Sequence, residues 1–215
     1  MNYSGRPDLN PMRDVGESIF KRAESFRDQL SRLPRNAATA LAEAQRGPFA
    51  RPLTSGERRL VVEAFGSKAR PESVRIVNGP AVNVIAQSAF MKGNPAITLG
   101  ETIYIKASRY RPDLASNAPD ASLLLHEFYH VTQYRRLGYD RFMWRYAREM
   151  SSHGFDPEKL YDYQSRNTTF AQETIEGQAE MVGVYAGLKF TNDTTSLVKM
   201  KAMASRMKGS GVYGF

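Results

Sequence analysis

The chain has 215 residues, which is enough for one domain with a hydrophobic core. Its hydrophobic content of 41% is ordinary for a globular protein, and it contains no cysteine. Disulfides, thiolate metal sites and cysteine nucleophiles are therefore excluded, so any transition metal would have to be held by His, Asp or Glu.

The net charge of +8 comes from 30 Lys and Arg against 22 Asp and Glu. The basic residues are spread along the chain, which favours a solvated surface and argues against a nucleic-acid partner. No stretch reaches the roughly 18 apolar residues that span a bilayer. The N-terminus lacks the apolar segment of a secretory signal. We expect a cytoplasmic protein without a membrane span, whose export, if any, uses a route independent of a signal peptide.

Residues 1–52 are interpreted as a basic N-terminal extension, because they contain five prolines, many charges and only short apolar runs. Residues 14–33 could form a helix that is charged over most of its surface. The extension is therefore expected to be partly helical or disordered and available to bind a partner.

A compact domain is predicted for residues 53–208. Thr54 and Glu57 have the spacing of a capping box at the start of a helix, and Gly66 suits its end. The last residues, 209–215, are expected to be a flexible tail.

The first half of this domain is predicted to form a small, mostly antiparallel sheet. Residues 74–77 and 82–85 are strand-like apolar runs, and residues 96–99 and 102–105 flank a short turn in a hairpin. The second half is predicted to be helical, at residues 121–137, 141–150, 169–188 and 197–207. The fold class is therefore α+β. We further expect the strand at 102–105 to run along a substrate cleft and to pair with an extended peptide.

The sequence His126-Glu127-Phe128-Tyr129-His130 is an HExxH motif inside the predicted helix at 121–137. Spacing of four residues places both imidazoles on one helix face, where both can bind one zinc ion. Glu127 can then act as general base towards the zinc-activated water. The alternative is a pair of hydrogen-bonded core histidines, but the chain has only three His, so chance placement at this spacing is rare.

The third ligand is predicted to come from the segment 173–180. Glu176 and Glu180 lie one turn apart, so Glu176 could bind zinc while Glu180 accepts a hydrogen bond from a ligand imidazole. Glu173 and His153 remain alternative ligands. The metzincin class is excluded because Arg136 stands where its third histidine would be.

Three residues between the two ligand helices are candidate donors to a developing oxyanion, namely Tyr161, Tyr163 and His153. Gln133 follows His130 by three positions, so it shares the helix face of the ligands and could hydrogen-bond near the zinc.

The run from His126 to Gln133 resembles the HExxHVxQ motif of bacterial metallopeptidase domains found with contractile injection systems, type VI secretion and Rhs- and Vgr-related proteins. The likeness extends over most of the chain after residue 52. It implies a zincin-like fold of the gluzincin kind, in which Glu176 matches the family's glutamate after the motif. Phe128 and Tyr129 are bulkier than the residues often seen inside the motif.

The sequence thus predicts a hydrolase with one zinc ion, a metallopeptidase acting on a protein or peptide as a secretion-associated effector. The alternative is a non-catalytic adaptor that keeps the zinc fold and docks onto a secretion apparatus through its N-terminal extension. The intact Glu127 favours the enzyme, because an adaptor needs no general base.

Overall fold

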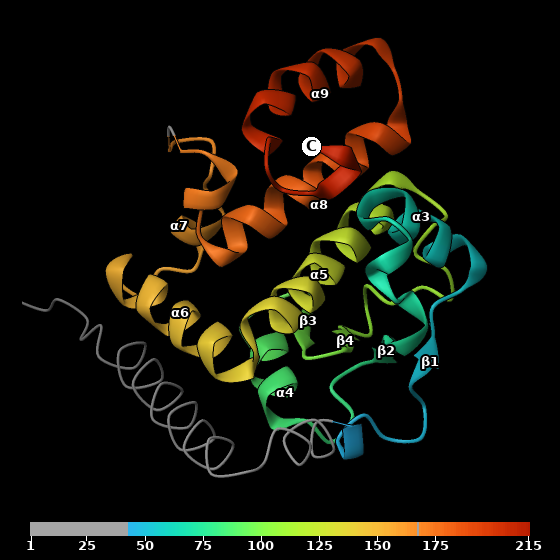
Figure 1. Cartoon of the computed structure of the whole chain (residues 1–215). Coiled ribbons are helices and arrows are strands. Elements are labelled where there is room, and N and C mark those ends of the chain that lie inside the picture. The colour runs from blue at the N-terminus through green and yellow to red at the C-terminus, as the bar shows by residue number, and fades with distance from the viewer. Residues whose placement is uncertain (1–42, 167) are drawn as a thin grey trace, which may run out of the picture.

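The computed structural model describes residues 43–166 and 168–215. The predicted helix at 14–33 and most of the N-terminal extension lie outside these residues. The elements, labelled in Figure 1, are β1 (Arg51–Pro52), α3 (Ser55–Phe65), η1 (Ser67–Ala69), η2 (Pro71–Ser73), β2 (Arg75–Asn78), α4 (Val84–Met91), β3 (Ala96–Leu99), β4 (Thr102–Ile105), α5 (Ala118–Leu137), α6 (Tyr139–Ser152), α7 (Glu158–Tyr161), η3 (Phe170–Gln172), α8 (Ile175–Thr191), α9 (Thr194–Met207) and η4 (Val212–Gly214).

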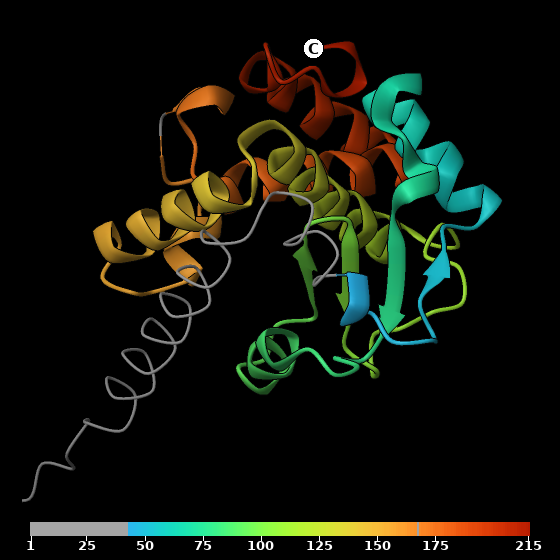
Figure 2. The ribbon, with the colours of Figure 1, turned by 60° about the horizontal axis from the view of Figure 1, so that its bottom comes forward.

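Four strands form one sheet in the order β1-β2-β4-β3 (Figure 2). The pairs β1–β2 and β3–β4 are antiparallel, whereas β2 and β4 are parallel. The predicted hairpin is confirmed, with Thr98 opposite Ile103. The strand predicted at 82–85 is wrong, since Asn83 caps helix α4 by accepting hydrogen bonds from the backbone of Ile85 and Ala86.

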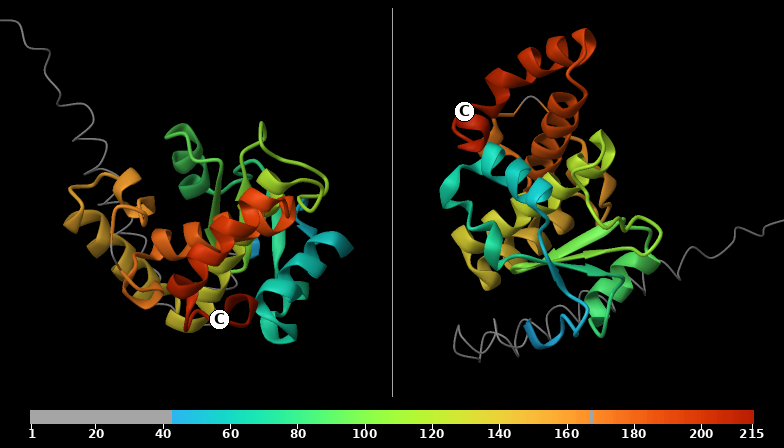
Figure 3. Two further views of the ribbon diagram at one scale, coloured as in Figure 1. Left: turned by 90° about the horizontal axis from the view of Figure 1, so that it is seen from above. Right: turned by 90° about the vertical axis from the view of Figure 1, so that its right-hand side faces the viewer.

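The two faces of the sheet pack against different helices. Ile76 and Ile103 point towards α5 and join its apolar residues in the main core. Tyr104 and Leu99 point the other way and pack on Phe90 of α4. The right-hand view of Figure 3 shows α4 and α5 on opposite sides of the strands. The period of two along a strand explains this division.

The position of β4 contradicts the expectation that the strand at 102–105 lines a substrate cleft. It lies between β2 and β3, and all four of its residues are buried, so it has no free edge. The edge strand on that side is β3, which also contacts α5. The parallel pairing of β2 with β4 makes β4 a central strand of the sheet, and no local feature of the sequence specifies this pairing.

Helices α5 and α8 make the most extensive contact between elements of the described chain, and they run side by side in Figure 1. Two glycines permit this approach. A Cβ added at Gly183 would lie 2.9 Å from the carbonyl oxygen of Ser122 and 3.0 Å from the Cβ of His126. Gly187 also faces Ser122, with its nearest atom at 3.4 Å. Small side chains therefore bring α8 close to the HExxH motif.

The predicted helices are confirmed with shifted ends. Helix α5 begins at Ala118, three residues before the prediction, because Asn117 is its N-cap and accepts a hydrogen bond from the backbone of Asp120. The helix predicted from residue 169 begins at Ile175, after a 3₁₀ turn over Phe170–Gln172. A capping threonine precedes each of these two elements.

The C-terminal residues are packed against the domain, which contradicts the expected flexible tail. Val212 is buried in the main core. The rings of Tyr213 and Phe215 lie 5.1 Å and 5.3 Å from that of Tyr185, measured between centroids. The apolar side chains of this short segment pack against the domain. Its glycines had suggested a flexible segment.

The N-terminal boundary of the folded part lies before the predicted residue 53. Strand β1 pairs with β2, and Asn83 donates a hydrogen bond to Gln45. Within the two stretches that the structure describes, no helix is long and apolar enough to cross a membrane.

Candidate metal centre

The HExxH motif lies in the middle of α5, where His126 and His130 face the same side. Their ring centroids are 5.0 Å apart, with the planes at 78°. Both imidazoles and Glu127 are buried. The bulky Phe128 within the motif points into the main core, where its ring stacks on that of Phe65 with the centroids 5.2 Å apart. It therefore points away from the two imidazoles.

Helix α8 brings Glu176 to the two histidines. Its Oε2 lies 3.1 Å from Nε2 of His130 and 3.5 Å from Nε2 of His126. The ligand atoms of these three side chains lie within 4.8 Å of one another, and in the described part of the chain they are the group of His, Asp and Glu that could hold a metal ion. Thr174 fixes the start of α8 by accepting a hydrogen bond from the backbone of Gly177.

Charges within this group shift the pKa values of its members. Burial alone would lower the pKa of His126, but hydrogen bonds to Glu176 and Glu180 and the charge of Glu127 outweigh it and raise the pKa to about 10. The pKa of His130 is also raised, because the charge of Glu176 outweighs burial. Burial would raise the pKa of Glu176, but the two imidazoles hold it well below its usual range. The three side chains are thus held together by the attraction between the imidazoles and the carboxylate of Glu176.

The other ring nitrogens of the two histidines also have partners. Nδ1 of His126 lies 3.3 Å from Oε2 of Glu180. Nδ1 of His130 lies 2.8 Å from Oε1 of Gln133, whose amide group donates to the carbonyl of Ile175 and to Oε1 of Gln178. Because that amide donates elsewhere, its oxygen must accept from Nδ1–H of His130. With Nδ1 of each ring held in this way, both Nε2 atoms face Glu176.

Thr98 is a site residue that the sequence analysis missed. Its hydroxyl lies 2.8 Å from Oε2 of Glu127 and 3.1 Å from the carbonyl oxygen of the same residue, and both residues are buried. Thr98 faces α5 because it shares a sheet face with its cross-strand partner Ile103. Alternation along the hairpin could have indicated this face, but not the partner.

Of the candidate oxyanion donors, Tyr161 is placed at the cluster. Its ring stacks on that of His126, with the centroids 5.9 Å apart and the planes at 18°. Burial, the negative charge of Glu176 and a hydrogen bond to that carboxylate all raise the pKa of Tyr161. The phenol therefore keeps its proton at neutral pH and can donate it in a hydrogen bond.

The structure places Tyr163 and His153 differently. Tyr163 is buried in the main core, with the guanidinium of Arg206 at 5.1 Å from its ring. His153 ends α6, where its Nδ1 lies 2.8 Å from the carbonyl oxygen of Glu149 and 3.1 Å from the hydroxyl of Ser152. Neither His153 nor Glu173, the two alternative ligands, belongs to the group of three donors.

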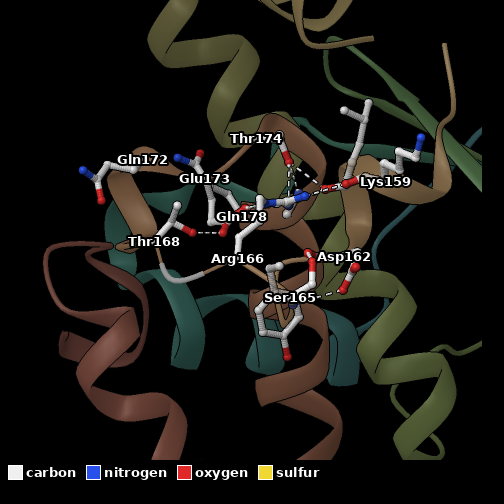
Figure 4. A network of polar contacts seen from close by, with 12 residues as sticks. Lys159, Asp162, Ser165, Arg166, Thr168, Gln172, Glu173, Thr174 and Gln178 are labelled. Atoms are coloured by element: carbon white, nitrogen blue, oxygen red, sulfur yellow. Dashed lines mark hydrogen bonds and ion pairs between the residues drawn. The ribbon is translucent and has the colours of Figure 1, made fainter. Parts of the chain in front are cut away.

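Glu173 is instead the centre of a separate polar network (Figure 4). Its carboxylate is buried and accepts hydrogen bonds from Arg166 and Thr168, and Arg206 lies 3.5 Å away. Gly177 in the first turn of α8 also faces this network.

Comparisons with known proteins agree with this fold. The structure is similar to the effector domain of Pseudomonas aeruginosa VgrG2b, with a TM-score of 0.53 and 21% identity over 80% of this chain and 93% of that one. No curated protein matches the sequence. Residues 52–138, which carry strands β2 to β4 and all of the HExxH motif but not Glu176, match the family described as the eCIS core domain.

Proposed function

We propose that this chain is a zinc metallopeptidase with a zincin-like site, in which His126, His130 and Glu176 hold one zinc ion. The observation that carries the proposal is the convergence of these three side chains, with both Nε2 atoms facing one carboxylate oxygen. A hydrogen-bonded partner on each Nδ1 is the arrangement typical of zinc-binding histidines.

The distances within the donor group suit zinc. Tetrahedral ligands at about 2.0–2.1 Å from zinc are about 3.3 Å apart. The two separations between imidazole nitrogen and carboxylate oxygen are 3.1 Å and 3.5 Å. Two imidazoles and one carboxylate are a donor set used by catalytic zinc sites, which keep a fourth position open. Zinc bound there would act as a Lewis acid and lower the pKa of a water towards 7.

The remaining residues support hydrolysis of a peptide bond. Glu127, next to His126 in the chain, would accept the proton of the attacking water, and Thr98 holds its carboxylate in place. Tyr161, kept protonated by burial and the nearby charge of Glu176, would donate a hydrogen bond to the developing oxyanion. The cluster would therefore supply a base and a protonated hydrogen-bond donor close to one another.

An effector role is supported by the two comparisons. One relative is named as an effector domain, and the family match is to a core domain named for eCIS. We infer that the chain acts with a contractile injection or related secretion system and that its substrate is a protein or peptide. The alternative, a non-catalytic adaptor, does not account for a buried Glu127 that is hydrogen-bonded and placed beside the zinc donors.

The test is cleavage of a peptide library by the metal-loaded full chain and by Glu127→Gln. The variant should fold and bind zinc as the wild type does, because Glu127 lies outside the donor set. Its activity should fall by about 10² to 10⁴, the usual contribution of a positioned acid–base group. A chelator should abolish wild-type cleavage, and added zinc should restore it. Equal cleavage by the variant would refute the mechanism, and no cleavage by wild type would favour the adaptor.

A further inference from the structure

The buried carboxylate of Glu173 lies beside two arginine side chains, those of Arg166 and Arg206. Oε2 accepts from Nε and Nη2 of Arg166 at 3.0 Å and 2.7 Å, and Arg206 lies 3.5 Å from Oε1. Thr168 donates a further hydrogen bond to Oε1. A buried carboxylate is stable only with such partners, so this network fixes one conformation of the residues that form it.

The network holds the end of α7. Arg166 also donates to the carbonyl oxygens of Lys159 and Leu160, at 2.5 Å and 3.0 Å, and Thr174 donates to that of Leu160 at 2.6 Å (Figure 4). The next residue in the chain is Tyr161. The last turn of α7 is thereby pinned to the start of α8.

Helix α7 needs such support because its own structure is weak. It has only four residues, Glu158–Tyr161, and its N-cap residue, Pro157, makes no side-chain hydrogen bond to the helix. An isolated helix of this length is unstable in water, since nucleation is unfavourable. The direction of the Tyr161 side chain, which stacks on His126, must therefore be set by contacts outside α7.

We propose that Glu173 and Arg166 are positioning residues, which clamp α7 so that the Tyr161 hydroxyl stays at the metal centre. This inference rests on the proposed function, in which Tyr161 stabilises the oxyanion. The clamp, defined as Arg166 and Glu173, touches none of the zinc donors in the contacts that the structure shows. Its loss should therefore lower catalysis without lowering zinc affinity.

Gly177 provides a variant that disturbs the clamp without removing any of its groups. A Cβ at this position would lie 2.5 Å from Oε2 of Glu173, 2.9 Å from Oγ1 of Thr174 and 3.0 Å from Nη2 of Arg166. Gly177→Ala must therefore displace the clamp. Gly187→Ala is the matched control, because it lies in the same helix and its Cβ would meet nothing closer than 3.4 Å.

The first measurement is the NMR signal of the Tyr161 ring in the tyrosine-labelled full chain, identified by its loss in Tyr161→Phe. Gly177→Ala should move this signal, and Gly187→Ala should not. Arg166→Lys keeps a positive charge beside Glu173 but cannot hold both carbonyl oxygens, so it should also move the signal. It replaces Gly177→Ala if that variant does not fold.

The second measurement is kinetic. Gly177→Ala should lower kcat about 10- to 100-fold, approaching Tyr161→Phe, whose loss of an oxyanion donor removes about 10²- to 10³-fold at most. Zinc affinity is measured by chelator competition on Arg166→Lys, which leaves the Thr174 cap at the start of α8 in place, and it should stay within about 3-fold. In the Tyr161→Phe background the glycine substitution should have no further effect, because both act through one group.

An unmoved Tyr161 signal in folded Gly177→Ala and Arg166→Lys would overturn the clamp, as would an equal loss of kcat in the Tyr161→Phe background. If the wild type cleaves no peptide, the proposed function fails and the NMR signals still decide the clamp.

Discussion

Gln133→Leu should weaken zinc binding by removing one hydrogen bond from a ligand imidazole. Leucine nearly matches the volume of glutamine, so the packing at this buried position is retained. Three polar groups lose a contact: Nδ1 of His130, the carbonyl of Ile175 and Oε1 of Gln178.

The size of the loss in stability depends on which of these three groups keep another hydrogen-bond partner. The Ile175 carbonyl still accepts its bond within α8, and Oε1 of Gln178 still faces the hydroxyl of Tyr129 at 3.5 Å. Only Nδ1–H of His130 is left without a partner. One unsatisfied buried donor costs about 1–3 kcal/mol, which is the expected loss in free energy of unfolding of the metal-free protein.

Zinc affinity should fall by about 10- to 100-fold, the usual effect of removing the partner of a ligand histidine. This corresponds to about 1.4–2.8 kcal/mol. Urea unfolding of the metal-free protein and chelator competition measure the two effects. Gln87→Leu, on the exposed side of α4, is the control and should change neither quantity. Wild-type zinc affinity in a folded Gln133→Leu protein would show that Gln133 does not orient His130.

Three further predictions concern the helix contact and the donor group. Gly183→Ala should lower the free energy of unfolding by up to about 2 kcal/mol, because overpacking against α5 costs about 1–3 kcal/mol and the gain in helix propensity returns only about 1 kcal/mol. Gly187→Ala should leave the free energy of unfolding unchanged or raise it, as measured by urea unfolding. Equal effects of the two substitutions would refute the close approach of α8 to α5. The pKa of His126 near 10, due to Glu176 and Glu180 outweighing burial, means that zinc binding at pH 7 displaces a proton. The affinity for zinc should therefore rise with pH, and calorimetry in buffers of different ionisation enthalpy should detect proton release. Zinc binding without proton release would contradict the positive charge assigned to His126. Glu176→Gln should lower zinc affinity far more than Glu180→Gln, and the reverse order would exchange their roles.

The helices and the donor spacing could be predicted from the sequence because they depend on local periodicity. The spacing of His126 and His130 fixes their common face once α5 forms. The pair Glu176 and Glu180 was informative for the same reason, since their contacts with the histidines repeat at one helical turn.

The predictions were wrong where a short apolar run suits either a strand or a helix, or where pairing between distant segments decides the structure. Residues 82–85 suit a strand, but Asn83 accepts two backbone hydrogen bonds as an N-cap, a local signal that favours helix α4. The enclosed position of β4 and the contact of Thr98 with Glu127 depend on the order of the strands. Nothing near these residues in the sequence specifies that order.

The role of Gly177 also depends on tertiary packing. Gly177 faces Arg166 and Glu173, whereas Gly183 lies against His126. Helical spacing shows that Gly177 and Gly183 differ in direction, but only the packed structure shows what each one meets.

X-ray absorption at the zinc edge of the zinc-loaded full chain would reveal the donors of the proposed metal centre. We expect one zinc per chain, with two imidazole nitrogens at about 2.0–2.1 Å and oxygen donors completing the shell. His130→Ala should remove one imidazole from the spectrum. A shell without two imidazoles, a third imidazole from His153, or the failure of the chain to retain stoichiometric zinc would contradict a site made of His126, His130 and Glu176.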